Sequence, residues 1–221
     1  MSRYNADDVY CILGTAVLKN KAGITNQNLL DEYEADFTAI RILELAHTPV
    51  EGNFDLAHLC KIHAYLFQDV YEWAGEIRSV DIIRGDSRFC NVRQIQSYSH
   101  TVFSALAAEE YLNNLESTAL ARRLAHYLSE INAIHPFREG NGRVQRLFIS
   151  QLAEQAGYSL DYSALGQEEI YSVMRSSFLG KKKPLADLNL KIINCQMKRQ
   201  PIKKPLTLKI SGFQIGGPTR T

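Results

Sequence analysis

Apolar residues recur every three or four positions along most of the chain, which is the spacing of helices that bury one face. This pattern predicts an N-terminal helix that starts at Thr25 or Asn26 and runs to the break at Thr48-Pro49. Further helices are predicted over residues 56–67, 94–111, 116–134, 144–156, 166–179 and 185–193. The aliphatic stripes of the last two are expected to be core.

Residues 79–93 are the one stretch with clear strand character. Apolar residues on both sides of a turn-rich centre predict a β-hairpin here. A lone hairpin is marginally stable and leaves an unpaired edge. It is therefore either a surface decoration or a flap that pairs its backbone with an extended segment of another protein. The residues of such a flap are Ile82, Ile83, Arg84, Gly85 and Asp86.

These patterns predict an all-α fold, a helical bundle with one small hairpin. Residues 1–24 are polar and indicate an extended arm, whose expected anchors are Leu13, Val17, Leu18 and Ile24. The domain is expected to span residues 25–196. Residues 197–221 form a basic tail, which we expect to be flexible and solvated, or else a linker into a longer protein.

Composition narrows the class of protein. The chain has 221 residues, of which 45% are hydrophobic and 22% charged, as in a soluble globular domain. Its net charge of +1 argues against nucleic-acid binding by the whole chain. Because it lacks an apolar signal core and any long apolar run, we expect no membrane association and a cytoplasmic protein, or one secreted into a host cell as an effector. The four cysteines have no metal-binding spacing and are expected to be reduced.

The most informative chemistry lies in residues 135–146, His-Pro-Phe-Arg-Glu-Gly-Asn-Gly-Arg-Val-Gln-Arg. Pro136 disfavours helix at the residue before it, so His135 is expected where the helix over 116–134 ends. The Gly-Asn-Gly run precedes the next helix, where successive N–H groups can form an anion-binding nest at a helix N-terminus. The stretch therefore predicts a phosphate site.

Charged residues of the same stretch extend this prediction. Arg143 and Arg146 are three residues apart on one helix face and could clamp separate phosphates. Glu139 offers a hard oxygen ligand of the kind that Mg²⁺ takes. His135 has a side chain whose pKa is near neutrality, so it can accept a proton from an attacking hydroxyl. This combination points to nucleotidyl or phosphoryl transfer.

The remaining histidines do not suggest a metal site. His126, Glu130 and His135 lack the spacing of a His-Glu-x-x-His zinc site. The other four are isolated in the sequence, so we expect them on the surface or packed in the core: His47, His58, His63 and His100.

Residues 135–146 resemble the signature of Fic-domain proteins, His-x-Phe-x-(Asp/Glu)-Gly-Asn-Gly-Arg-x-x-Arg, at all eight specified positions. Residues 73–78, Trp-Ala-Gly-Glu-Ile-Arg, resemble the Trp-Ala-Gly-x-x-Arg segment that commonly precedes the target-binding hairpin of that family. By themselves, Trp73 and Gly75 indicate a packed helix end. The resemblance implies a mainly helical fold and transfer of AMP from ATP to a Ser, Thr or Tyr hydroxyl of a target protein, with pyrophosphate leaving.

The resemblance also implies a role for each motif residue. His135 would be the general base and Glu139 the ligand of an Mg²⁺ cofactor, with ATP as co-substrate. Phe137 would anchor the loop in the core. The phosphates would be bound in two groups, the α- and β-phosphates by Gly140, Asn141 and Gly142, and the β- and γ-phosphates by Arg143 and Arg146.

Fic proteins are often inhibited by a helix bearing Ser/Thr-x-x-x-Glu-Gly/Asn, whose glutamate pairs with the second motif arginine. No segment of this chain fits that pattern. We therefore expect inhibition in trans, by a small helical antitoxin whose glutamate reaches Arg146. The chain would then be the toxin half of a toxin–antitoxin pair.

Two alternatives stay within the same fold. Relatives of this family transfer other phosphate-containing groups, but the kinase-like ones replace the second motif glycine with lysine, whereas Gly142 is intact here. The other alternative is an inactive nucleotide-binding interaction module. Retention of His135, Glu139 and both arginines argues against it.

Overall fold

The computed structural model describes residues 9–84 and 87–195 and confirms the all-α prediction. Its α-helices are α1 (Gln27–His47), α2 (Leu56–Phe67), α3 (Ile95–Ala108), α4 (Ser117–Ile134), α5 (Asn141–Gln155), α6 (Gln167–Phe178) and α7 (Lys183–Ile192). Within these residues there are also three short 3-10 helices, η1 (Val92–Gln94), η2 (Glu110–Leu112) and η3 (Tyr162–Ala164). The predicted basic tail lies outside the described residues.

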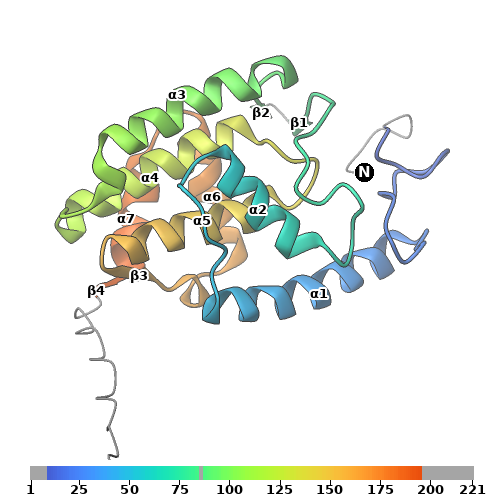
Figure 1. Cartoon of the computed structure of the whole chain (residues 1–221), viewed down its shortest axis with the longest axis horizontal. Coiled ribbons are helices and arrows are strands. Elements are labelled where there is room, and N and C mark those ends of the chain that lie inside the picture. Colours follow the sequence, from blue (N-terminus) through green and yellow to red (C-terminus); the bar gives the residue numbers. More distant parts are fainter. Residues whose placement is uncertain (1–8, 85–86, 196–221) are drawn as a thin grey trace, which may run out of the picture.

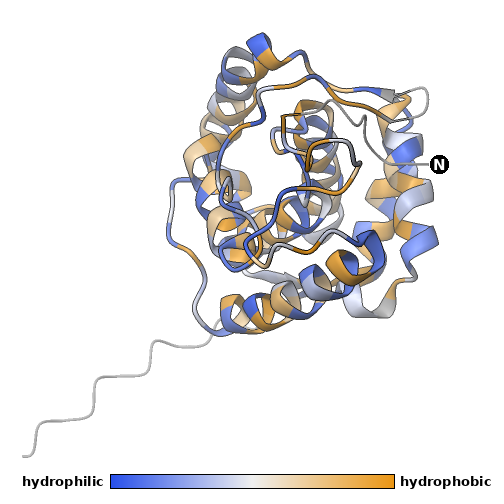
Figure 2. Ribbon diagram, turned by 90° about the vertical axis from the view of Figure 1, so that its right-hand side faces the viewer, coloured by the Kyte–Doolittle hydropathy of each residue, from blue (hydrophilic) through white to orange (hydrophobic). Residues whose placement is uncertain are grey.

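Helix α4 is the centre of the bundle, with α3, α5, α6 and α7 packed around it (Figure 1). Its buried side chains recur at helical spacing, as the sequence pattern requires for a helix covered on several sides. They include Leu120, Leu124, Tyr127, Leu128, Ile131 and Ile134. Polar and apolar residues alternate around the helices (Figure 2), and no helix in the described part of the chain is long and apolar enough to cross a membrane.

Local capping explains where the first two helices begin. The Asn26 side chain accepts a hydrogen bond from the Leu29 N–H at 3.2 Å, which decides between the two predicted caps. Asp55 caps α2 in the same way, accepting from the His58 N–H at 2.8 Å. The interpretation of Trp73 and Gly75 as a helix end was wrong, because α2 ends at Phe67 and both residues lie in the loop that follows.

The predicted hairpin is present but short. Strand β1 (Ile83–Arg84) pairs antiparallel with β2 (Ser87–Arg88), with Ile83 opposite Arg88. Residues 85 and 86 lie outside the described residues. The prediction that this is the one stretch with strands was wrong, because β3 (Tyr158–Leu160) pairs with β4 (Ile193–Cys195). Strands of three residues are too short to show a period of two, and these two pair across a long stretch of chain.

The described part of the N-terminal arm folds back on itself. Cys11 and Leu18 form an isolated antiparallel bridge, which places both side chains in the core. Val17 is buried as expected, but Leu13 is 95% exposed. Leu13 lies at the tip of this turn, next to Gly14 with its φ of +74°, so it points away from the domain.

Two glycines share the same backbone angle but differ in their surroundings, so alanine substitutions there can separate the free-energy cost of backbone strain from that of a steric clash. Gly75 and Gly157 both have a φ of +90°. A Cβ on Gly75 would lie 2.8 Å from the Cβ of Ala64, whereas one on Gly157 would meet nothing within 4 Å.

We expect Gly157→Ala to lower the free energy of unfolding by about 1–2 kcal/mol, the cost of left-handed backbone for a residue with a Cβ. Gly75→Ala should cost about 1–3 kcal/mol more, because the added methyl group overpacks the contact with α2. Chemical denaturation of both variants measures the difference. Equal losses would show that the Gly75 loop relaxes freely.

Candidate active site

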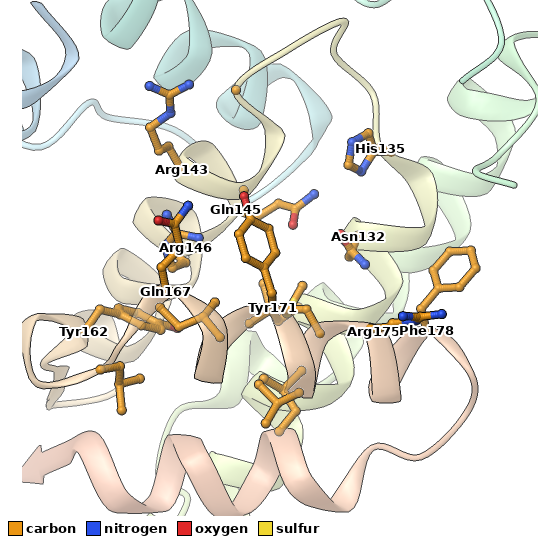
Figure 3. A pocket seen from close by; sticks show the side chains of 18 of the residues that line it. Asn132, His135, Arg143, Gln145, Arg146, Tyr162, Gln167, Tyr171, Arg175 and Phe178 are labelled. Carbon is orange, nitrogen blue, oxygen red and sulfur yellow. The ribbon is translucent and has the colours of Figure 1, made fainter. Parts of the chain in front are cut away.

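A cavity of about 690 Å³ opens where α4 ends and α5 begins (Figure 3). Residues of α1 form one part of its wall, and residues of α6 and α7 form another. The structure brings most of the predicted motif residues to this cavity, namely His135, Glu139, Gly140, Gly142, Arg143 and Arg146. Asn141, Ile82 and Ile83 are not among the residues that line it.

His135 sits at the C-terminal end of α4, where its backbone turns left-handed with a φ of +48°. Its N–H still bonds to the Ile131 carbonyl at 3.0 Å, so the histidine directly follows the last helical turn, as Pro136 predicted. The imidazole is 6% exposed and stacks on the Phe89 ring, with 3.7 Å between ring centroids. Phe89 follows β2, so the hairpin segment contacts the imidazole directly.

Gly140 ends the loop and begins α5. Its φ is +77°, and a Cβ there would lie 2.1 Å from the Phe67 ring, so backbone and space both require glycine. The N–H of Arg143 donates to the Gly140 carbonyl at 3.1 Å and so begins the hydrogen bonding within the helix. The N–H groups of Asn141 and Gly142 come before it, and such groups at a helix N-terminus can bind an anion.

The Asn141 side chain has a structural role that the motif did not reveal. Its amide oxygen accepts from the Phe137 N–H at 3.0 Å, and its amide nitrogen donates to the Phe137 carbonyl at 2.7 Å. These bonds close the loop from residue 137 to residue 141. The Phe137 ring is fully buried, as expected of an anchor. Only the backbone of Asn141 is therefore available to a ligand.

His63 supports the same loop from α2. Its Nδ1 accepts from the Gly75 N–H at 2.7 Å, so the hydrogen is on Nε2, which lies 3.2 Å from the Glu139 carbonyl and donates to it. The imidazole also stacks on Phe137, with 4.0 Å between ring centroids. Burial lowers the pKa of His63 to about 3, so the ring stays neutral. The sequence had indicated an isolated histidine, because its partner is 76 residues away.

The two motif arginines point in different directions (Figure 3). Arg143 forms an ion pair with Glu34 of α1 and donates to the Thr38 hydroxyl at 3.2 Å. The Tyr71 hydroxyl donates to the other oxygen of Glu34. Arg146 faces the cavity beside Gln167, and in the described part of the chain it has no carboxylate partner. Burial lowers its pKa, although a guanidinium remains charged. Arg146 is thus a cation without a local counter-charge.

Glu139 is part of the cavity wall, and one of its carboxylate oxygens accepts from the Gly140 N–H at 3.0 Å. In residues 9–84 and 87–195 no group of three or more His, Cys, Asp or Glu side chains could hold a metal ion. The cavity wall also carries the carboxylates of Asp31 and Glu34, and Glu34 is engaged by Arg143, so the wall offers only a partial set of metal ligands beside Glu139. That suits Mg²⁺, which completes its shell with water and phosphate oxygens, better than a metal that needs a full set of protein ligands.

Helix α6 contributes residues that the sequence had assigned to the core. Its apolar stripe also lines the cavity, and Ser177 is the one residue of the helix that is fully buried. Helical periodicity cannot distinguish a face toward the core from a face toward a cavity. The core prediction for 166–179 is therefore only partly right, because Val173 and Met174 pack against the core and also line the cavity. The cavity-lining residues of α6 include Gln167, Ile170, Tyr171, Val173, Met174 and Phe178.

The hairpin segment reaches the cavity through Phe89, whose ring stacks on the imidazole. Ile82 is buried and Ile83 is 58% exposed, as the alternation of a strand requires. The Cys90 N–H donates to the Ala133 carbonyl at 2.9 Å, which joins the end of the hairpin to α4. Gly85 and Asp86 of the predicted flap lie outside the described residues.

The buried, neutral His63 predicts acid sensitivity. Its folded pKa of about 3 is below the ordinary value of 6.5, so the unfolded chain binds more protons between these pH values. Stability must then rise with pH through this window and fall on acidification. Between pH 6.5 and 4.5 we expect His63 to account for a loss of roughly 2–3 kcal/mol.

Denaturant unfolding at several pH values checks this. His63→Gln should lose less stability on acidification than wild type, whereas His100→Gln, on an exposed histidine of α3, should behave as wild type. NMR of the His63 imidazole in the wild-type chain should show a neutral ring at pH 4.5. A ring that titrates near pH 6 would contradict the assignment.

Comparison with known proteins agrees with this geometry. The model of the Fic/DOC family matches residues 53–153, which include the cavity loop. The chain is 42% identical over 181 residues to the protein adenylyltransferase VbhT of Bartonella schoenbuchensis, with 81% of this chain and 38% of the relative covered. The chain thus spans well under half the length of that relative.

Two further matches extend over nearly the whole length of the protein that is matched. A probable protein adenylyltransferase of Sinorhizobium fredii is 44% identical over 188 residues, with 84% of this chain and 96% of the relative covered. The crystal structure of the BepC protein of Bartonella tribocorum with bound AMPPNP superposes with a TM-score of 0.80 at 28% identity, covering 85% of this chain and 97% of that one. On these matches, the chain belongs to the Fic/DOC family.

Proposed function

We propose that this chain is a protein adenylyltransferase, which transfers AMP from ATP to a hydroxyl side chain of a target protein. The observation that carries the proposal is that one cavity holds a histidine, a helix N-terminus and an arginine that has no carboxylate partner among the described residues. Relatives that are 35–44% identical are named protein adenylyltransferases or probable ones, which supports the same activity. The proposed catalytic domain spans residues 25–196.

His135 is the general base of the proposed reaction. An imidazole nitrogen takes the proton of the acceptor hydroxyl, whose oxygen then bonds to the α-phosphorus of ATP. The bond from that phosphorus to the bridging oxygen of the β-phosphate breaks, and pyrophosphate leaves. The imidazole is 6% exposed and held against Phe89, so its orientation is fixed before the substrates arrive.

The N-terminus of α5 binds the phosphates. The N–H groups of Asn141 and Gly142, together with the helix dipole, provide the cradle for the α- and β-phosphates, and Gly140 lets the chain turn into it. Arg146 neutralises the γ-phosphate from the cavity wall. Arg143 contributes to the β-phosphate, in competition with Glu34, which pairs with it in the described structure.

Glu139 is the residue that would hold Mg²⁺, because its carboxylate lines the same cavity as the phosphate cradle. When bound, the metal ion would neutralise charge on the phosphate oxygens. The protein's own contribution is to fix the Glu139 backbone, through the hydrogen bond from His63 to its carbonyl.

The face of α6 fits the nucleoside. It offers apolar and aromatic side chains, among them Ile170 and Tyr171, opposite the phosphate cradle. Such a mixture of an apolar wall and a few polar groups is typical of small-molecule sites. BepC, which superposes on this chain, was solved with the ATP analogue AMPPNP.

The hairpin is proposed as the flap that presents the target. Of its described residues, Phe89 stacks on the His135 imidazole, and the edge of β1 would pair its backbone with the target. The uncompensated Arg146 is also the residue that the glutamate of a separate antitoxin would reach, with the chain as the toxin half. The proposed place of action is the cytoplasm, or a host cell if the chain is an effector.

The first experiment incubates the chain with Mg²⁺ and cell lysate, and with ATP labelled at the α- or the γ-phosphate. We expect protein labelling only from the α-label, and a loss of at least about 100-fold in His135→Ala, since general-base catalysis supplies that much. Labelling from the γ-phosphate would identify a kinase instead. Nucleotide binding without any labelling would identify a binding module.

A second prediction concerns Glu34. Replacing its carboxylate by an amide in Glu34→Gln releases Arg143 and removes a negative charge from the cavity wall. The affinity for ATP should rise by about three- to tenfold, the effect of one partly screened charge. Isothermal titration with a non-hydrolysable ATP analogue measures it.

Glu44→Gln is the matched control for Glu34→Gln. Glu44 lies on the same helix and pairs with an arginine, Arg41, but it does not line the cavity. Its affinity for the analogue should equal that of wild type. A lower affinity in Glu34→Gln would show that Glu34 orients Arg143 toward the nucleotide rather than competing with it.

A further inference from the structure

Arg78 is a buried cation that the proposed reaction does not use. It lies in the loop between α2 and β1, and its side chain is fully buried. The guanidinium donates to four backbone carbonyls, those of Val80 at 2.6 Å, His135 at 2.8 Å, Ile134 at 3.4 Å, and Cys90. The nearest carboxylate is Asp81, at 3.6 Å and half exposed.

These carbonyls belong to two parts of the site. Val80 and Cys90 lie on either side of the β1–β2 hairpin, whereas Ile134 and His135 form the end of α4 (Figure 1). The backbone adds to the connection, because the Arg78 N–H donates to the Pro136 carbonyl at 2.9 Å. One side chain therefore joins both legs of the hairpin to the residue proposed as the base.

Packing alone does not account for an arginine at this position. Burial lowers the pKa of Arg78, which reflects the cost of placing a charge in the core. An apolar side chain of similar volume would avoid that cost. What arginine adds is a rigid fork of five N–H donors, which fixes several acceptors relative to one another. The arrangement suits a residue that sets geometry.

We propose that Arg78 is a positioning residue that fixes the hairpin relative to His135, and so sets the register in which a hydroxyl presented by the hairpin meets the imidazole. The inference rests on the proposed function. Arg78 does not line the nucleotide cavity, so its effect falls on transfer to the target and spares nucleotide binding. This assigns a role to the arginine of the Trp-Ala-Gly-Glu-Ile-Arg segment.

The test compares Arg78→Lys and Arg78→Gln with wild type. Lysine keeps the charge but cannot hold four carbonyls, so transfer of AMP to lysate proteins should fall about tenfold, and about 100-fold in Arg78→Gln, as expected for misplacement by about 1 Å. Affinity for a non-hydrolysable ATP analogue should change less than about threefold in both, because the cavity is intact. Thermal unfolding identifies the variants that are folded.

Arg123→Lys is the matched control. Arg123 of α4 also makes a bidentate bond, to Glu109, but lies away from the cavity and the hairpin. The Arg123→Lys variant should transfer AMP at the wild-type rate. Wild-type transfer in folded Arg78→Gln would overturn the proposal, and so would a loss of nucleotide affinity that parallels the loss of transfer.

Hydrogen exchange separates failure of this inference from failure of the proposed function. If the wild-type chain transfers no AMP, the activity proposal fails, but the positioning role is still testable. The backbone N–H groups of residues 90 and 78 donate to the carbonyls of Ala133 and Pro136. Their hydrogen exchange should be faster in Arg78→Gln and unchanged in Arg123→Lys. Unchanged exchange in Arg78→Gln would overturn the positioning role.

Discussion

The site depends on one short loop whose backbone is left-handed at both ends, at His135 and at Gly140. A histidine in that conformation is strained, and such strain persists only where surrounding contacts determine it. Here the core provides them. Asn141 closes the loop internally, His63 holds the Glu139 carbonyl, and Arg78 holds the carbonyl of His135. The loop is thus built by buried polar side chains that satisfy its backbone.

Buried groups and cavity-facing groups have different roles in this site. The side chains that hold the loop are buried and take part in no proposed chemistry. Among the groups that face the cavity, Arg146 is the one motif arginine with no carboxylate partner in the described part of the chain. A preorganised site of this kind needs no rearrangement when charge develops on a substrate. It follows that damage to the support should affect catalysis without removing any cavity residue.

The charge distribution gives α1 a part in the site. Glu34 neutralises Arg143 from a helix that begins over a hundred residues earlier, and Tyr71 fixes the other oxygen of its carboxylate. The two motif arginines, equivalent by spacing, are therefore unequal in electrostatics. A nucleotide would meet one compensated and one uncompensated cation.

The sequence by itself predicted α1 to α7 of the described residues, an N-cap at Thr25 or Asn26, the hairpin and the motif loop, because helical period, capping and glycine requirements are set by neighbouring residues. The sequence did not reveal the β3–β4 pair, the cavity face of α6, or the roles of His63, Arg78 and Glu34. Those depend on contacts that span 57 residues from Arg78 to His135, 76 from His63 to Glu139 and 109 from Glu34 to Arg143. A lone polar residue has no periodic signal, so only the tertiary structure decides whether it lies on the surface or supports the site.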